Sequence, residues 1–575
     1  MQVQNRHDTF ETFDNVRRPL TAAANCVRQR PDRRSWTFSI VLAFALCTVG
    51  LAQQYHVHDE HPVDADQPIG YVNFQVSCDE PLKGDFDRAL GLMHHMMYEQ
   101  AREGFQEILS TEPSCAMAYW GVATTLFQPL WPSRPNEATL MRGWENIEQA
   151  RALDKDPREA VLIEATGAFF ADPETAEYWT RIDRWADGMQ SAYQTFPDDL
   201  DIAALYSLSR IAIAPLAQDG SARSALFDEA ERVLRNVFEQ AELHPGAMHY
   251  SIHATDVDGR AANALDMVAL YGEIAPHVPH ALHMPTHIYV RLGEWPGVID
   301  WNRRSADAAL QFPVGDRVSL HYIHALDYML YGYLQQGDDI SAQTVLEEAL
   351  AVSTYQEDFA AAFHLAIMPA RFAVERREWN EAVNLQLNQP EYLQWTRYTW
   401  PQAITMFARG LGAVMSDRLD EAKEAESGMA TLRDQAMDAG ERAFGTYIEI
   451  DRLILSGWIA RADGDAEAAV SFMQEAAALE GTVEKHPVTP GALLPPYEAL
   501  GDLLFDLGRF EEALDAYSSS DDRWPSRFHT LLGAARAAQA AGDDETARVH
   551  AARLIAVAGS SERPDLAEAR ALATQ

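Results

Sequence analysis

Apolar and small residues recur along this chain with the spacing of amphipathic helices, in units of 34 residues. One unit begins at Pro245, has Ala264 and Val268 at its twentieth and twenty-fourth positions, and ends near Pro276. The next unit begins at Pro279. A small residue at the twentieth position lets the second helix of a unit approach the first closely, and a proline near the end stops that helix. The pattern therefore predicts an all-α chain of helix–turn–helix repeats.

Glycine-led turns mark further units along the chain. They read Gly293-Glu294-Trp295, Gly337-Asp338-Asp339, Gly508-Arg509-Phe510 and Gly542-Asp543-Asp544. Small residues recur at the twentieth position of these and other units, at Ala101, Ala342, Ala382, Ala513 and Ala547. Together these residues resemble the tetratricopeptide repeat family, over about residues 85–560. The resemblance implies a right-handed superhelical solenoid whose first helices line a concave groove.

The repeat register divides the chain into a small number of regions. We expect a signal peptide at residues 1–52, an extended leader rich in His, Pro and Asp at 53–84, and the solenoid at 85–575. Breaks in the register near 128–137, 312–322 and 388–401 predict insertions between repeats. An insertion on the concave side would line or cap the groove.

The signal peptide is inferred from an apolar run at residues 38–51, which follows several arginines and ends in small residues. The run is shorter than the ~20 apolar residues that span a bilayer, so we expect cleavage and no transmembrane domain afterwards. Arg33-Arg34 leaves a twin-arginine export signal open as an alternative. Either route predicts a periplasmic or extracellular protein.

Charge and cysteine content limit the kinds of partner that the protein can bind and the compartments in which it can reside. Asp and Glu number 86 against 46 Lys and Arg, giving a net charge of −40. This balance argues against nucleic acid or an anionic membrane surface as a partner. Only Cys78 and Cys115 remain after the expected cleavage. In an oxidising compartment they form either one disulfide or two buried thiols, and the sequence leaves both open.

Histidines are concentrated in the middle of the chain with a regular spacing. His249 and His253 are four residues apart, as are His283 and His287, so each pair shares one face of a helix. The two pairs are 34 residues apart, which places imidazoles at the same two positions of consecutive repeats. Histidines scattered through a core would not keep that register.

The resemblance to tetratricopeptide repeats implies that these positions face the concave groove. The candidate metal ligands are His249, His253, Asp256, His280, His283 and His287. The candidate groove residues of the following repeats are His324, Asp327, Tyr331, His364 and Arg371.

A shared transition metal ion fits this arrangement. Packed helices lie ~8–10 Å apart, so imidazoles facing across the gap can reach the ~2.0–2.1 Å that a zinc-like ion requires. The nitrogen-rich set suits Cu, Zn or Fe and leaves the identity of the metal open. Asp256 and Asp327 would act as ligands or as partners that orient the imidazoles.

The function remains divided between three classes. We expect first an exported scaffold whose His-rich groove holds a metal or binds a protein or peptide, since histidine also suits hydrogen bonding to a peptide. The alternative is a metal-dependent enzyme in which Asp256 or Tyr331 assists, under a lid formed near residue 312 or 388. The third is a plain interaction adaptor.

No familiar catalytic motif occurs, so catalytic residues stay unknown. The chain also resembles secreted bacterial tetratricopeptide proteins with the segments HPGxxHYxIH and HMPxHIY, which bring no established reaction.

Overall fold

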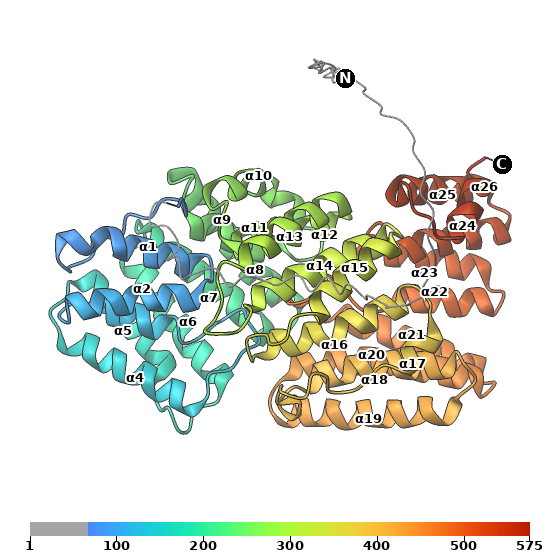
Figure 1. The fold of residues 1–575 in the computed structure, drawn as a ribbon, viewed down its shortest axis with the longest axis horizontal. Coiled ribbons are helices and arrows are strands. Elements are labelled where there is room, and N and C mark those ends of the chain that lie inside the picture. Colours follow the sequence, from blue (N-terminus) through green and yellow to red (C-terminus); the bar gives the residue numbers. More distant parts are fainter. Residues whose placement is uncertain (1–66, 575) are drawn as a thin grey trace, which may run out of the picture. The chain divides into compact units, whose positions relative to one another are not determined.

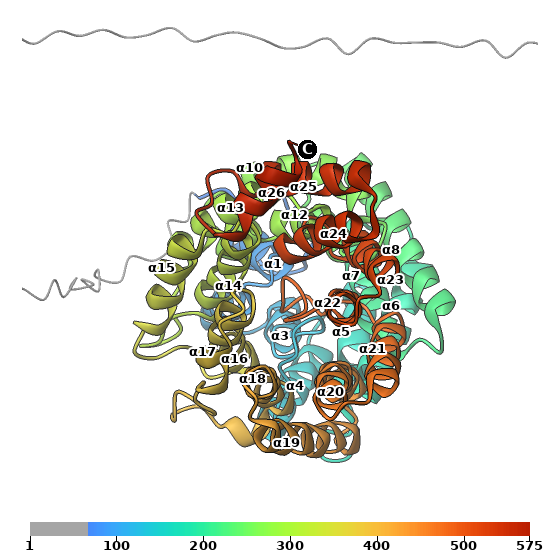
Figure 2. The same cartoon turned by 90° about the vertical axis from the view of Figure 1, so that its right-hand side faces the viewer.

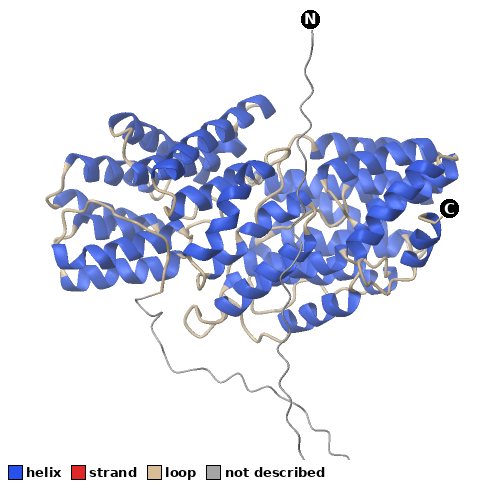
Figure 3. Cartoon of the chain, turned by 90° about the horizontal axis from the view of Figure 1, so that it is seen from above, coloured by secondary structure: helices blue, strands red, loops and turns tan. Residues whose placement is uncertain are grey.

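A computed structural model describes residues 67–574, which fold into α-helices joined by loops and short 3-10 turns (Figure 3). These residues contain isolated bridges but no strand, so the all-α prediction is confirmed. The predicted signal peptide and residues 53–66 of the predicted leader lie outside the described residues. Within residues 67–574 no helix combines the length and the apolar character needed to cross a membrane.

The helices follow one another in chain order (Figure 1). The N-terminal helices are α1 Lys83–His94, α2 Tyr98–Thr111, α3 Ala116–Thr124, α4 Glu137–Ala152, α5 Pro157–Phe170, α6 Tyr178–Thr195, α7 Leu200–Ile213 and α8 Gly220–Gln240. The central helices are α9 Pro245–Thr255, α10 Leu265–Ile274, α11 Pro279–His283, α12 Pro285–Leu292, α13 Trp295–Ala309, α14 Leu320–Gln335, α15 Asp339–Leu350, α16 Phe359–Val374 and α17 Trp379–Val383. The C-terminal helices are α18 Thr399–Val414, α19 Leu419–Asp438, α20 Arg442–Ala462, α21 Ala466–Glu480, α22 Pro496–Asp506, α23 Phe510–Arg523, α24 Phe528–Ala541, α25 Asp544–Ala558 and α26 Asp565–Leu572.

The glycine-led turns join the two helices of a pair, as the repeat pattern predicts. Gly293, Gly337, Gly508 and Gly542 have φ angles of 67°, 67°, 73° and 84°, in the left-handed region that favours glycine. The small residues of the pattern pack between the paired helices and are at most 3% exposed, at Ala101, Ala342, Ala382, Ala513 and Ala547. The helix–turn–helix repeat is therefore present along the described chain.

The solenoid returns on itself, so that its C-terminal repeats contact its centre. Figure 2 shows the helices arranged around a central axis. The Trp295 indole N–H donates to the carbonyl oxygen of Ser526 at 2.9 Å, and Arg563 forms an ion pair with Asp339 at 2.6 Å. These contacts enclose the inner faces of the central helices.

Two loops lie over those inner faces. The loop between α3 and α4 carries Trp131, whose ring lies 5.4 to 6.0 Å from the rings of His280, His321 and His324. The loop between α21 and α22, which the sequence does not single out, carries Lys485 and its neighbours. The first of these loops coincides with the insertion predicted near 128–137, whereas the lid of an enzyme was expected near residue 312 or 388.

Cys78 and Cys115 form a disulfide, which is the first of the two alternatives that the sequence leaves open. The bond joins the segment before α1 to the residue that precedes α3.

Candidate metal centre

Five central helices, α9, α11, α12, α14 and α16, bring their histidines to a common interior. Each begins with a residue suited to a helix start. His244 precedes α9 and accepts a hydrogen bond from the backbone N–H of Ala247 at 3.1 Å through Nδ1, while Asp358 caps α16. Pro285 begins α12 and separates it from α11, because proline has no N–H to continue the helix. This break lies between His283 and His287.

The first cluster consists of His283, His287 and His324, here called the first triad. One ring nitrogen of each lies within 4.8 Å of the others, and all three side chains are at most 2% exposed. The Nε2 atoms of His283 and His287 are 3.0 Å apart. The ring of His324 lies 4.2 Å from that of His283.

Fixed acceptors determine where the protons of His283 and His287 lie. The Nδ1–H of His283 donates to Asn302 Oδ1 at 2.7 Å, and the amide nitrogen of Asn302 donates to the Val298 carbonyl at 2.7 Å, which fixes the amide orientation. The Nδ1–H of His287 donates to Asp256 Oδ2 at 2.8 Å. In the neutral rings, both Nε2 lone pairs therefore face each other without a proton between them.

His324 is oriented through a second histidine. The carboxylate of Asp327 accepts from His364 Nδ1 at 3.1 Å, which leaves His364 Nε2 to accept from His324 Nδ1 at 2.9 Å. With neutral imidazoles, the lone pair of His324 therefore resides on Nε2. All three members of the first triad thus present an Nε2 lone pair that a protein partner has oriented from the other side of the ring.

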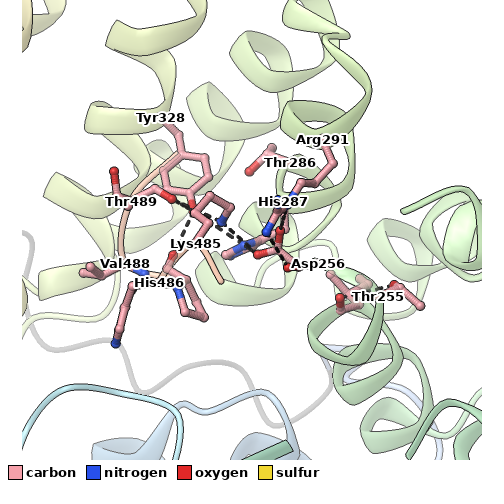
Figure 4. Close-up of polar contacts among 12 residues, drawn as sticks. Thr255, Asp256, Thr286, His287, Arg291, Tyr328, Lys485, His486, Val488 and Thr489 are labelled. Atoms are coloured by element: carbon pink, nitrogen blue, oxygen red, sulfur yellow. Dashed lines mark hydrogen bonds and ion pairs between the residues drawn. The ribbon is translucent and has the colours of Figure 1, made fainter. Parts of the chain in front are cut away.

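Asp256 is the centre of a charged network behind the first triad (Figure 4). Besides His287, its carboxylate accepts from Lys485 Nζ at 2.9 Å and from Arg291 Nε at 2.9 Å. Burial by itself would raise the pKa of Asp256, but the charges of Lys485 and Arg291 outweigh it and hold that pKa well below its ordinary value. Asp256 therefore remains a carboxylate that fixes the His287 tautomer, and its oxygens are occupied by these three partners.

The electrostatic environment keeps the first triad unprotonated. Burial lowers the pKa of His283 and of His324 well below the ordinary value, and each of these imidazoles disfavours charge on its neighbours. Burial also lowers the pKa of His287, against the opposing effect of Asp256. Neutral imidazole is the form that binds metal ions, so protons compete weakly here at neutral pH.

A second cluster, here called the second triad, contains His249, His253 and His280. One ring nitrogen of each again lies within 4.8 Å of the others, and the three are at most 6% exposed. The ring of His253 lies 5.6 Å from that of His287, and the ring of His280 lies 5.8 Å from that of His283. The two triads are therefore adjacent.

A third cluster of His94, Asp201 and His244 has a different character. His244 uses Nδ1 as the cap acceptor of α9, so its Nε2–H donates to Asp201 Oδ1 at 3.2 Å. His94 lies 3.3 Å from the same carboxylate oxygen and 3.1 Å from the Tyr250 hydroxyl. The partners of this cluster are hydrogen-bonded to one another, which is typical of a structural polar network.

The structure divides the histidines differently from the sequence interpretation. We expected His249, His253, His283 and His287 to share one ion, but each pair belongs to a different triad, completed by His280 or His324. Asp256 lies behind His287 as an orienting partner.

The predicted groove residues are buried instead of facing an open trough. His324, Asp327, Tyr331, His364 and Arg371 are at most 2% exposed. Arg371 donates to the Gly491 carbonyl at 3.2 Å, and Tyr331 accepts from Arg527 Nη1 at 2.7 Å. The returning C-terminal repeats therefore fill the space that an isolated groove would leave open.

Asn302 is the orienting residue that sequence reasoning missed, although the repeat contained a signal for it. Asn302 is the twenty-fourth residue of the unit that begins at Pro279, a position that Val268 occupies in the preceding unit. A polar residue at this apolar position is fully buried. Such a substitution indicates a buried partner that needs a hydrogen bond.

Comparison with known proteins adds little to this geometry. No protein-family model matches the chain, and no curated protein does. Among solved structures, it is similar to a tetratricopeptide repeat protein from Parabacteroides merdae, with 12% identity over 52% of this chain and 99% of that chain at a TM-score of 0.29. It is also similar to the APC/C hetero-tetramer Cut9-Hcn1, with 11% identity over 86% of this chain and 89% of that chain at a TM-score of 0.29. Scores this low carry no structural or functional argument.

Proposed function

We propose that this protein binds a transition metal ion through His283, His287 and His324. The observation that carries the proposal is the 3.0 Å separation of the His283 and His287 Nε2 atoms, whose lone pairs face each other. Two buried lone pairs in this position repel each other unless a cation lies between or beside them. Because Asn302 and Asp256 hold the protons on the opposite ring nitrogens, neither ring supplies that cation.

The geometry favours a metal-dependent enzyme over a scaffold. Structural zinc sites have four protein ligands, whereas catalytic sites have three and keep one position for water or substrate. The first triad supplies three imidazoles in a buried interior, under Trp131 and the loop that carries Lys485. An ion bound there would supply Lewis acidity and an activated water. A peptide-binding groove would need the same residues exposed.

Three neutral imidazoles suit Cu, Zn or Fe, and the affinity of such a site rises toward copper along the divalent series. The test is elemental analysis of protein purified without a His-tag or chelating resin, before and after reconstitution with each metal. We expect His324→Ala to lose the ion of the first triad. The matched control is His277→Ala, since His277 lies in the same segment but is exposed.

Equal metal contents for His324→Ala, His277→Ala and the unaltered protein would overturn the proposed ligand set. Circular dichroism checks that the two variants retain the helix content of the unaltered protein.

A separate measurement tests the open coordination position. Azide added to protein loaded with Co(II) should change the visible d–d bands, because an exogenous ligand can occupy a fourth position. Bands that stay unchanged at saturating azide would contradict a catalytic site and favour a closed, structural ion. His277→Ala should respond as the unaltered protein does.

We further propose that the protein is exported. The disulfide between Cys78 and Cys115 supports an oxidising compartment, where such bonds persist. Cell fractionation of the full chain tests this: a mature form that stays with the cytoplasmic marker would contradict export.

A further inference from the structure

The second triad contains more unpartnered polar atoms than a protein interior normally holds. His249 Nε2, both ring nitrogens of His253 and both ring nitrogens of His280 are buried without a hydrogen-bond partner among the described residues. A buried polar group without a partner destabilises the folded state, because it loses its hydrogen bonds to water and gains none in return. Neighbouring positions in the same helices are filled with apolar side chains, so three imidazoles here require a different explanation from packing.

His249 is already oriented as a ligand. Its Nδ1–H donates to the carbonyl oxygen of His94 at 2.6 Å, which leaves the lone pair on the unpartnered Nε2. A backbone carbonyl behind an imidazole is a common way of fixing the tautomer of a metal ligand. The rings of His253 and His280 lie 5.0 Å from that of His249.

Nothing cationic among the described side chains approaches the three nitrogens closely enough to bond with them. The nearby cation Lys485 donates to Asp256 and to the Thr489 carbonyl instead. The lone pairs of the second triad therefore face one another, and no positively charged side chain among the described residues bonds to them.

We propose that His249, His253 and His280 hold a second ion, adjacent to the first, so that the two triads form a binuclear copper centre. This proposal rests on the proposed function of the first triad. Six imidazoles from two facing sets surround the pair, and each set lacks a carboxylate ligand. The ring of His253 is 5.6 Å from that of His287, which brings the two ions into the same interior.

The charge that two bound ions would bring into the interior favours copper over the other metals that imidazole binds. Two divalent ions without an anionic ligand would place about four positive charges in a buried interior, at a high desolvation cost. Asp256 does not offset this, because Lys485 and Arg291 already neutralise it. Two cuprous ions bring half that charge, and imidazole is a suitable ligand for copper.

The test uses the full chain, loaded with Cu(I) under anaerobic conditions, desalted and analysed for copper per protein. We expect two equivalents in the unaltered protein and in the His277→Ala control. His253→Ala should retain one equivalent, held by the first triad, and His324→Ala should lose the ion of the first triad. His280→Asn, which preserves a polar side chain, is a second variant in case His253→Ala does not fold.

After oxidation to Cu(II), electron paramagnetic resonance measures the proximity of the two ions. In the unaltered protein, magnetic interaction between them should broaden the spectrum or reduce the detected spin below the copper content. His253→Ala should give the full signal of one isolated ion.

The outcomes separate this inference from the proposed function. One equivalent in the unaltered protein that His253→Ala also retains would overturn the second site and leave the first intact. No copper in any variant would overturn the copper centre, and only the additional failure to bind zinc or iron would overturn the proposed function of the first triad. Two equivalents whose spectrum equals the sum of two isolated ions would overturn the adjacency of the sites.

Discussion

Asn302 is the residue whose substitution most directly tests how the first triad is oriented. Asn302→Leu removes the acceptor of His283 Nδ1–H and leaves that ring free to adopt the other tautomer. Loss of a partner behind a metal-ligating histidine typically weakens metal binding 10–100-fold, and we expect that range here. Competition with a chelator of known affinity measures it. Asn236→Leu, at an exposed position of α8, should leave the affinity unchanged. Equal affinity in both variants would remove Asn302 from the site.

His95 is a buried histidine outside both triads and makes folding stability depend on pH. Its Nδ1 lies 2.8 Å from the Tyr271 hydroxyl and its Nε2 lies 3.0 Å from the Ile69 carbonyl oxygen. Burial lowers its pKa from 6.5 to about 4. Between these pH values the unfolded chain binds a proton that the folded chain does not, so stability falls as pH decreases through this window.

The buried, neutral state of His95 lowers the free energy of unfolding by about 3 kcal/mol once pH is below 4. We expect His95→Gln to flatten the dependence of the unfolding free energy on pH between 6.5 and 4. Urea unfolding of metal-free protein at several pH values measures the slope. The other buried histidines are common to both proteins, so the difference in slope belongs to His95. Parallel slopes would contradict its buried neutral state.

At the scale of single residues, the sequence predicts which histidines form the site better than it predicts how they divide into two triads. The four-residue spacing and the repeat register identify His249, His253, His283 and His287. The division into triads depends on ring rotation and on which helix lies opposite each ring. A one-dimensional pattern contains neither quantity, and the covering Trp131 comes from a loop more than 100 residues away.

Several glycines allow a large aromatic ring of a neighbouring helix to approach closely. A Cβ atom at Gly272 on α10 would lie 1.9 Å from the Trp301 ring on α13. Gly272→Ala must therefore displace the indole or the helix, and overpacking of this kind costs about 1–3 kcal/mol. Thermal unfolding should occur at a lower temperature. Gly84→Ala on α1 is the matched control, since an added Cβ there meets nothing within 4 Å. Equal unfolding temperatures for the two variants would show that the contact between position 272 and Trp301 adjusts to the added Cβ atom without loss of stability.

The elements themselves were largely predictable. The turns at Gly293, Gly337, Gly508 and Gly542 follow from the 34-residue period because each requires a left-handed residue between two helices. The break between α11 and α12 is signalled by Pro285. Pro369, in contrast, lies inside the continuous helix α16, so proline alone does not determine where a helix ends.

The return of the C-terminal repeats onto the centre could not be predicted from the repeat pattern. A solenoid is specified by contacts between neighbouring repeats, and its closure depends on small rotations that accumulate over many units. The ion pair between Lys485 and Asp256 joins residues 229 positions apart. No local signal in the loop between α21 and α22 indicates this partner, and for that reason the groove residues were expected to be open.

Arg527 provides a test of how much this closure stabilises the whole molecule. It precedes α24, is 1% exposed, and donates to Tyr331 at 2.7 Å, Glu375 at 2.8 Å and Glu498 at 2.9 Å. Glu375 ends α16, so the guanidinium joins the C-terminal repeats to the helices that orient the first triad.

Arg527→Met should destabilise the protein by about 3–5 kcal/mol, because buried carboxylates lose their counter-charge. Arg536→Met removes partly exposed ion pairs with Asp565 and Glu568 and should cost at most ~1 kcal/mol. Denaturant unfolding measures both variants. If Arg527→Met were as mild as Arg536→Met, closure of the solenoid would contribute little to stability. In Arg527→Met with Glu375→Gln and Glu498→Gln, we expect part of the loss to be recovered, since the uncompensated charges, more than the lost contacts, cause the instability.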